Sequence, residues 1–193
     1  MYARLYAKRF PGEVAGLVLL DPTHEDVVAY LPEKAAQRLS DWKTDDLFPS
    51  EQMQAMRAMY RATFGRALAD WSAEIREPLL DQGFSSEGYR QSVREPMNLP
   101  HLFGEVRDAG PDPDVPLIFV SAMGSDTFAE ELVPPEARES AAESTQARHQ
   151  LYIDLAAALP RAEVRRVDDA GHSGIAWLRP DAVVQAIRDT LSR

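Results

Sequence analysis

Three short apolar runs stand out along the chain, and each is bounded by turn residues. The runs are residues 14–20, 115–121 and 162–167. A short continuous apolar run of this kind is typical of a strand that is buried on both faces of a parallel sheet. Pro116 is compatible with such a strand because it lies at the start, where a missing backbone N–H is tolerated.

Between these runs, apolar residues recur every three or four positions, which predicts helices. The helical stretches are residues 1–10, 145–159 and 181–191. Asp181 is expected to cap the last of them, and the acidic residues 127–144 are expected to form a loop that leads into the middle one. Strands that alternate with helices indicate βαβ units, and therefore an α/β fold with three parallel strands and flanking helices.

Residues 23–108 have a different texture, in which charged residues mix with Met, Leu, Ala and Trp at helical spacing. Four prolines are expected to divide this segment into several helices. They are Pro32, Pro49, Pro78 and Pro100. An apolar stripe is interpreted as helix core, with the wall of an apolar acyl pocket as the alternative. The stripe is Met53, Met56, Met59, Tyr60 and Phe64. We therefore expect a core of residues 1–22 and 111–193 and a helical cap of residues 23–110.

The charge of the chain argues against two classes of partner. The 193 residues carry 21 basic and 31 acidic side chains, a net charge of −10. Nucleic acids and anionic membranes require clustered Lys and Arg, so neither is expected to bind. No apolar run approaches the roughly 20 residues of a membrane span, and no signal-peptide core is recognisable. Cytoplasm is the default location, and the absence of cysteine excludes disulfides and thiolate sites.

One histidine lies where catalysis would need it. His172 sits beside Gly171 on a turn between the run 162–167 and the helical stretch 181–191. A general base must be exposed, rigidly aimed and free to pass a proton, and such a turn provides this. Gly171 is expected to allow a positive φ that brings the imidazole over the sheet edge. No Gly-x-Ser-x-Gly nucleophile elbow occurs anywhere in the chain.

Both ends of the chain resemble the α/β-hydrolase family. Residues 2–22 resemble the segment after that family's nucleophile elbow, where a helix ends near Phe-Pro and a strand reads Gly-Leu-Val-Leu-Leu-Asp. The turn at His172 matches the family's catalytic histidine. The resemblance implies a partial α/β-hydrolase fold that lacks the early strands, the oxyanion-hole loop and the nucleophile. The chain is therefore expected to be the C-terminal part of a longer parent protein.

The family places its nucleophile, acid and histidine in that order along the chain, and the acid usually follows the strand before the histidine strand. By this resemblance Asp126 is the expected acid, with an ordinary turn or capping role as the alternative. The acidic residues 130–143 would lengthen the segment between Asp126 and His172. Asp21, which ends the run 14–20, is a rival for the same role, although an Asp-Pro there is more often structural.

Several other residues carry side chains suited to catalysis or binding. Ser125 and Ser173 lie near the expected acid and base, but neither is in an elbow, and both are expected to be non-catalytic. His24 is expected either to bind substrate from the strand end or to be a solvated loop histidine. A metal site at His24, Glu25 and Asp26 lacks recurring ligand spacing. His101 and His149 lie in helical stretches and are expected on the surface.

The resemblance implies a parent enzyme that hydrolyses a small apolar ester or similar acyl substrate without a cofactor. His172 would be the general base, Asp126 the acid that orients it, and a serine upstream of the chain the nucleophile. The alternatives are a non-catalytic remnant that acts as a binding module, and an epoxide hydrolase or dehalogenase with an Asp nucleophile. The chain alone is expected to be inactive and to associate through the open edge of its first strand.

Overall fold

The computed structural model describes residues 1–41, 50–88, 91, 98–126 and 135–193. The chain divides into two compact units. One unit consists of residues 1–40 and 101–193, and the other of residues 41–100. The first unit contains the sheet and is described first.

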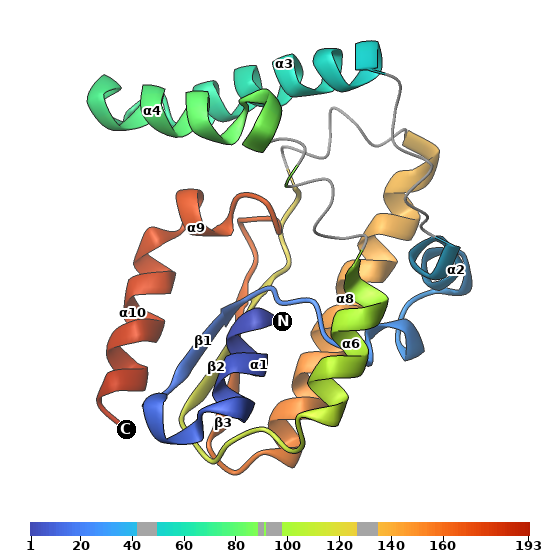
Figure 1. Cartoon of the computed structure of the whole chain (residues 1–193), viewed down its shortest axis with the longest axis vertical. Coiled ribbons are helices and arrows are strands. Elements are labelled where there is room, and N and C mark those ends of the chain that lie inside the picture. The colour runs from blue at the N-terminus through green and yellow to red at the C-terminus, as the bar shows by residue number, and fades with distance from the viewer. Residues whose placement is uncertain (42–49, 89–90, 92–97, 127–134) are drawn as a thin grey trace. The chain divides into compact units, whose positions relative to one another are not determined.

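Three parallel strands form one sheet in the first unit, as the apolar runs predict (Figure 1). The strands are β1 (Leu17–Leu20), β2 (Leu117–Ala122) and β3 (Ala162–Val167), in the spatial order β1-β2-β3. Leu17 pairs with Leu117 in register, and Leu117 pairs with Ala162. All six residues of β2 are buried because the strand lies between two neighbours and is covered on both faces.

Two strands begin later than the sequence predicts. Residues 11–13 form the 3₁₀ turn η1 (Pro11–Glu13), so the first pairing of β1 occurs at Leu17, whose N–H donates to Pro116 O at 2.8 Å. Pro116 cannot donate a ladder hydrogen bond, which explains why β2 starts one residue after it. The third strand has the predicted bounds.

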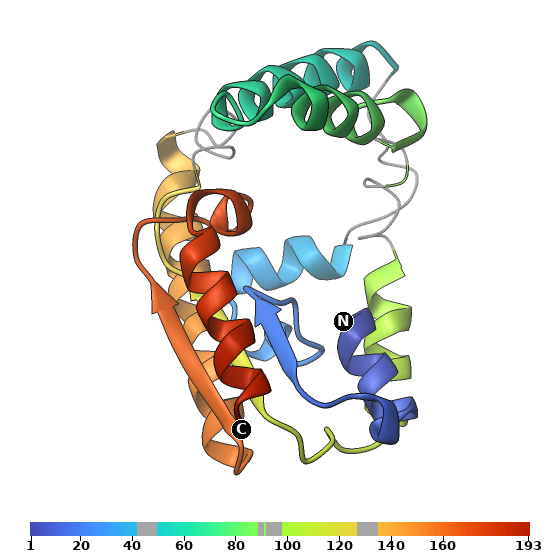
Figure 2. The same cartoon turned by 90° about the vertical axis from the view of Figure 1, so that its left-hand side faces the viewer.

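Helices cover both faces of the sheet. Helix α10 (Pro180–Leu191) lies on one face, whereas α6 (Leu99–Asp108) and α8 (Pro135–Ala158) lie on the other (Figures 1 and 2). The side chains of β2 alternate accordingly. Ile118 and Val120 belong to a core cluster with Ala186 of α10, while the ring of Phe119 stacks on Tyr152 of α8 at a centroid distance of 5.6 Å.

The first helix, α1 (Tyr2–Arg9), packs on α6 rather than standing alone. Leu5 of α1 forms a second core cluster with Leu102 and Val106 of α6. The amphipathic pattern of residues 1–10 therefore predicts this helix correctly. The unit also contains two short helical segments, η2 (Val27–Ala29) and α9 (Ile175–Leu178).

Three local expectations are wrong. Helix α8 starts at Pro135, well before residue 145, and a proline is well suited to the first turn of a helix. The N-cap of α10 is Arg179, not Asp181, which lies in the first turn and forms an ion pair with Arg179 at 2.7 Å. Pro78 does not end a helix, because it lies inside α4 (Ala73–Gly83).

The remaining helices are as follows. Helix α2 (Glu33–Asp41) follows Pro32 directly. The second unit contains α3 (Ser50–Ala67) and α4, which contact each other. Leu68 and Leu80 are buried there, and the rings of Phe64 and Phe84 lie 5.3 Å apart. Met56, Met59 and Tyr60 are half-buried on α3. Pro49, the side chain of Met53 and the acidic residues 130–134 lie outside the described part.

None of the helices in the described ranges combines the length and the apolar character that a membrane crossing requires.

Candidate active site

Asp21 ends β1 in an unusual backbone conformation. Its N–H donates to Val120 O at 2.7 Å, which extends the pairing with β2, and its φ is then +40°. Among the described residues it is the one non-glycine with positive φ, a conformation that Asp tolerates better than most side chains. Its carboxylate is 2 % exposed and lies at the carboxyl edge of the sheet, with Oδ1 3.4 Å from the N of Ala122.

His172 meets this carboxylate from the turn after β3. Its Nδ1 is 2.8 Å from Asp21 Oδ2, although the two residues are 151 positions apart in the chain. The imidazole is 57 % exposed while the carboxylate is buried. A carboxylate can only accept, so Nδ1 donates and the neutral ring keeps Nε2 free of a proton. The hydrogen bond to Asp21, opposed by burial, raises the pKa of His172.

The structure corrects the expected pairing of Asp126 with His172. Asp126 Oδ2 accepts the backbone N–H of Ser173 at 2.9 Å, so this side chain holds the histidine turn by its backbone. The ring itself pairs with Asp21, the rival acid. Sequence reasoning could not separate the two acids because each follows a strand of the sheet. The αL conformation at Asp21, which aims its side chain, left no signal in the sequence.

Gly171 is needed for a different reason from the one expected. Its φ is not in the positive range. Instead, a Cβ at Gly171 would lie 2.6 Å from the N and 2.4 Å from the Cα of Asp126, and a Cβ at Gly124 would lie 2.5 Å from the N of Ala170. Two glycines thus let the histidine turn and the loop after β2 approach backbone to backbone. This contact fixes where His172 stands.

Among the described residues, the imidazole of His172 makes its side-chain hydrogen bond with Asp21, and no serine hydroxyl bonds to it. Ser173 contributes its backbone N–H to Asp126. A different serine, Ser121 of β2, lies 2.9 Å from His149 Nδ1 on α8, and both side chains are buried. His149 is therefore not the surface residue expected. His101 is exposed, as expected, and pairs with Glu105 at 3.0 Å.

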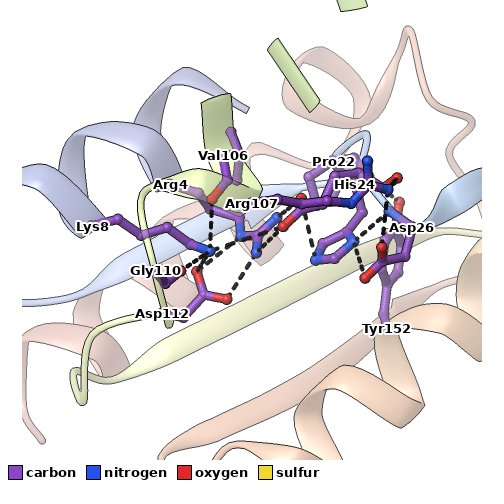
Figure 3. A network of polar contacts seen from close by, with 11 residues as sticks. Arg4, Lys8, Pro22, His24, Asp26, Val106, Arg107, Gly110, Asp112 and Tyr152 are labelled. Atoms are coloured by element: carbon purple, nitrogen blue, oxygen red, sulfur yellow. Dashed lines mark hydrogen bonds and ion pairs between the residues drawn. The ribbon is translucent and has the colours of Figure 1, made fainter. Parts of the chain in front are cut away.

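His24 is neither solvated nor directed to solvent, because it is 3 % exposed. Figure 3 shows it inside a network of polar side chains. Its Nδ1 accepts the N–H of Asp26 at 3.1 Å, and its Nε2 lies 3.5 Å from Glu25 Oε2. Burial, together with the charge of Arg4, lowers the pKa of His24 to about 4, so the ring is neutral at neutral pH. This burial disagrees with the expectation of a substrate-binding histidine.

Arg4 is the centre of the same network (Figure 3). The guanidinium, 2 % exposed, donates to Glu25 Oε2 at 2.5 Å and to Asp112 Oδ2 at 2.8 Å. Lys8 donates to the carbonyl oxygens of Val106 and Gly110 and lies 3.9 Å from both acids. Two cations thus balance two carboxylates. The cluster ties α1 to the loop after β1 and to the segment between α6 and β2.

The described ranges contain no group of three or more His, Cys, Asp or Glu side chains that could hold a metal ion. An open hollow of about 460 Å³ lies between β3 and α10. Asp21 and His172 do not line it, and its Arg166 and Arg179 already pair with Asp168 and Asp169. We therefore regard the His172–Asp21 pair as the candidate active site.

Comparison with known proteins supports the fold alone. No family model and no curated protein matches the chain. Among solved structures, the chain is similar to a probable hydrolytic enzyme from Pseudomonas aeruginosa PAO1, with a TM-score of 0.52 and 18 % sequence identity. The match covers 99 % of this chain and 60 % of that structure. At this identity the likeness shows a shared α/β fold and nothing of the activity.

The close backbone approach at Gly171 gives a first prediction. Gly171→Ala should lower the free energy of unfolding by about 1–3 kcal/mol, because the added methyl overlaps backbone atoms that cannot rotate away. Chemical denaturation measures the change. Gly12→Ala is the matched control, since nothing lies within 4 Å of a Cβ there. Equal free energies of unfolding for the two variants would show that the backbones of Gly171 and Asp126 leave room for a methyl group.

The second prediction concerns the proton affinity of His172. Titration of its ring protons by NMR should give a pKa above the ordinary value for histidine, and Asp21→Asn should lower it, because the hydrogen-bonded carboxylate is the main cause. Asn tolerates the positive φ at position 21. Asp126→Asn should lower the pKa less. A larger effect of Asp126→Asn would restore the original assignment of the acid.

The third prediction tests the buried network. Arg4→Met should lower the free energy of unfolding by about 3–5 kcal/mol, because it leaves two carboxylates without their guanidinium. Arg9→Met on the same helix is the control, and it removes an ion pair with Glu105 whose arginine side chain is 52 % exposed. This control should cost about 1 kcal/mol or less. Thermal or urea unfolding of both variants compares them, and similar losses would contradict a stabilising role for Arg4.

Proposed function

We propose that this chain supplies the histidine and the acid of a Ser-His-Asp hydrolase that acts on an ester or similar acyl substrate. The observation that carries the proposal is the 2.8 Å contact between exposed His172 and buried Asp21 at the carboxyl edge of a parallel sheet. Sheets of this kind bind ligands beyond the carboxyl ends of their strands. Asp21 takes the role first expected of Asp126.

The proposed mechanism follows from the tautomer that Asp21 imposes. Nε2 of His172 accepts the proton of a serine hydroxyl as its oxygen attacks the acyl carbon. The imidazolium that forms is stabilised by the Asp21 carboxylate, and it then gives the proton to the departing alcohol. A water molecule deacylates the serine in the same way, with His172 again taking and returning one proton.

The nucleophile and the oxyanion donors are proposed to come from a segment that precedes this chain in the parent enzyme. Two observations support this. The described residues bring no serine hydroxyl to His172, and the matched hydrolytic enzyme is longer than the region that this chain covers. Without the serine and the donors, the chain by itself is proposed to be inactive.

The edge of β1 is the proposed docking place for that segment. Within the described part of the chain, β1 pairs with β2 alone. Tyr2 and Tyr6 of α1, and Phe10 just after it, are each about half exposed. An unpaired edge and exposed apolar rings favour the addition of a strand from another segment, or association of chains. Within residues 23–110, the part that forms the second unit, residues 41–100, is proposed to be the cap that shapes an apolar acyl pocket.

The fourth prediction tests this function in a longer protein that includes the proposed upstream segment. A protein that includes the upstream segment should hydrolyse p-nitrophenyl esters, and residues 1–193 alone should not. His172→Ala and Asp21→Asn should each lower kcat by about 10⁴-fold, because both remove the working base. Asp126→Asn should retain most of the activity, since its carboxylate holds the turn rather than the ring.

The outcomes separate the alternatives. Ester hydrolysis that survives His172→Ala would contradict the proposal. An Asp at the elbow position, with epoxide or haloalkane turnover, would indicate the epoxide hydrolase or dehalogenase class. A folded parent that has neither nucleophile nor turnover would indicate a binding module.

A further inference from the structure

Helix α8 presents two polar side chains to the Asp21 carboxylate. Arg148 and Tyr152 are one helical turn apart, so they share a face of the helix. Each lies near a different oxygen of Asp21. Apolar packing does not account for either residue, because a hydroxyl or a guanidinium loses free energy of hydration when it is moved towards the protein interior. Their common neighbour is the carboxylate that pairs with His172.

Tyr152 holds the turn on which Asp21 stands. Its side chain is fully buried, and its hydroxyl lies 2.7 Å from Pro22 O and 3.3 Å from Asp21 Oδ1. Both neighbours are acceptors, so the phenol must donate. Burial and the charge of Asp21 raise the pKa of Tyr152, which keeps the hydroxyl protonated. The ring is fixed in turn by its stacking on Phe119 at an interplanar angle of 6°.

Arg148 approaches the other oxygen of the carboxylate. Its Nη2 is 3.7 Å from Asp21 Oδ2, the atom that accepts from His172, and the same nitrogen donates to Thr145 Oγ1 at 3.2 Å. Its Nε is buried and has no hydrogen-bond partner among the described residues. The guanidinium therefore stands beside the His172–Asp21 hydrogen bond without saturating Oδ2. A cation in this place opposes a second positive charge on the imidazole.

We propose that Arg148 and Tyr152 are positioning residues for the candidate active site: Tyr152 fixes the direction of the Asp21 carboxylate, and Arg148 limits how strongly that carboxylate favours protonated His172. The catalytic role in this proposal rests on the proposed hydrolase function, whereas the contacts with Asp21 are independent of it. Among the described residues, the charged and titratable groups around the pair come from four elements. They are Asp21 after β1, Asp126 after β2, His172 after β3, and Arg148, His149 and Tyr152 on α8.

The charges around His172 act on its pKa in opposite directions, and this gives Arg148 a role. Asp21, and to a smaller extent Asp126, favour the imidazolium, while Arg148 disfavours it. A histidine that pairs with a buried carboxylate and lacks such a cation would hold its proton more tightly and act less well as a base at neutral pH. Arg148 thus opposes protonation of His172 and favours the neutral ring.

The experiment uses the chain of 193 residues and requires no activity. Arg148→Met should raise the pKa of His172 in an NMR titration. Arg138→Met is the matched control, because it removes the same charge from the same helix about 15 Å away along its axis and should leave the pKa unchanged. Equal titration curves for wild type, Arg148→Met and Arg138→Met would overturn the role of Arg148.

Tyr152→Phe tests the second half of the proposal. The variant keeps the stacked ring and loses the hydroxyl. The Nδ1 proton of His172 should then exchange with water faster than in wild type, because the carboxylate is less firmly held. Tyr30→Phe, which removes an exposed hydroxyl that bonds Asp154, is the control. In an active parent enzyme, Tyr152→Phe should lower kcat about tenfold with little change in KM.

The readouts distinguish failure of this inference from failure of the proposed function. Unchanged proton exchange in Tyr152→Phe would overturn the role of Tyr152, whatever the activity of the parent. Altered titration and exchange in a parent without hydrolase activity would support the contacts and reject only the catalytic assignment.

Discussion

A buried carboxylate at the end of β1 is the constraint on which the candidate site depends. Removing Asp21 from water costs several kcal/mol unless donors replace the lost solvent. The donors come from separate parts of the chain: His172 from the turn after β3, Tyr152 from α8, and the N–H of Ala122 from β2. These elements must converge for Asp21 to be accommodated. The geometry of the site therefore depends on the same packing of strands and helices that forms the sheet.

A second buried group of charges joins three segments of the first unit that are far apart in the sequence. Arg4 near residue 1 and Asp112 just before β2 meet Glu25, which follows β1. Because two cations face two carboxylates, no net charge is left inside. A buried ion pair of this kind contributes less to stability than an apolar core of the same size, but it specifies which segments meet. Here it orients α1 against the loop that follows Asp21.

The sequence carried much of the information on the fold and part of that on the site. The three parallel strands follow from the apolar runs, and the exposed His172 follows from a glycine-flanked turn between a strand and a helix. The identity of its partner does not. Asp21 and Asp126 both follow strands, and the choice depends on a positive φ at Asp21 and on backbone contacts of Gly171 that only the three-dimensional structure reveals.

The polar contacts of α8 and of His24 were missed for a related reason. Sequence periodicity distinguishes apolar from polar faces, and it assigns polar residues to the surface by default. The structure buries His149 and Arg4 against partners distant in the chain, and it buries His24 beside Glu25 and Asp26. One signal was present at Ser121, since a hydroxyl within an apolar strand requires a buried hydrogen-bond partner. The nature of that partner could not be read from the strand.

The protonation pattern of the neutral His172 ring tests the central claim most directly. Long-range ¹H–¹⁵N correlation spectra, recorded above the pKa of this histidine, distinguish a protonated ring nitrogen from a bare one. Because Asp21 can only accept, the account predicts a proton on Nδ1 and none on Nε2. The opposite tautomer, with a bare Nδ1, would show that His172 does not donate to Asp21 and would contradict the assignment of this pair as base and acid.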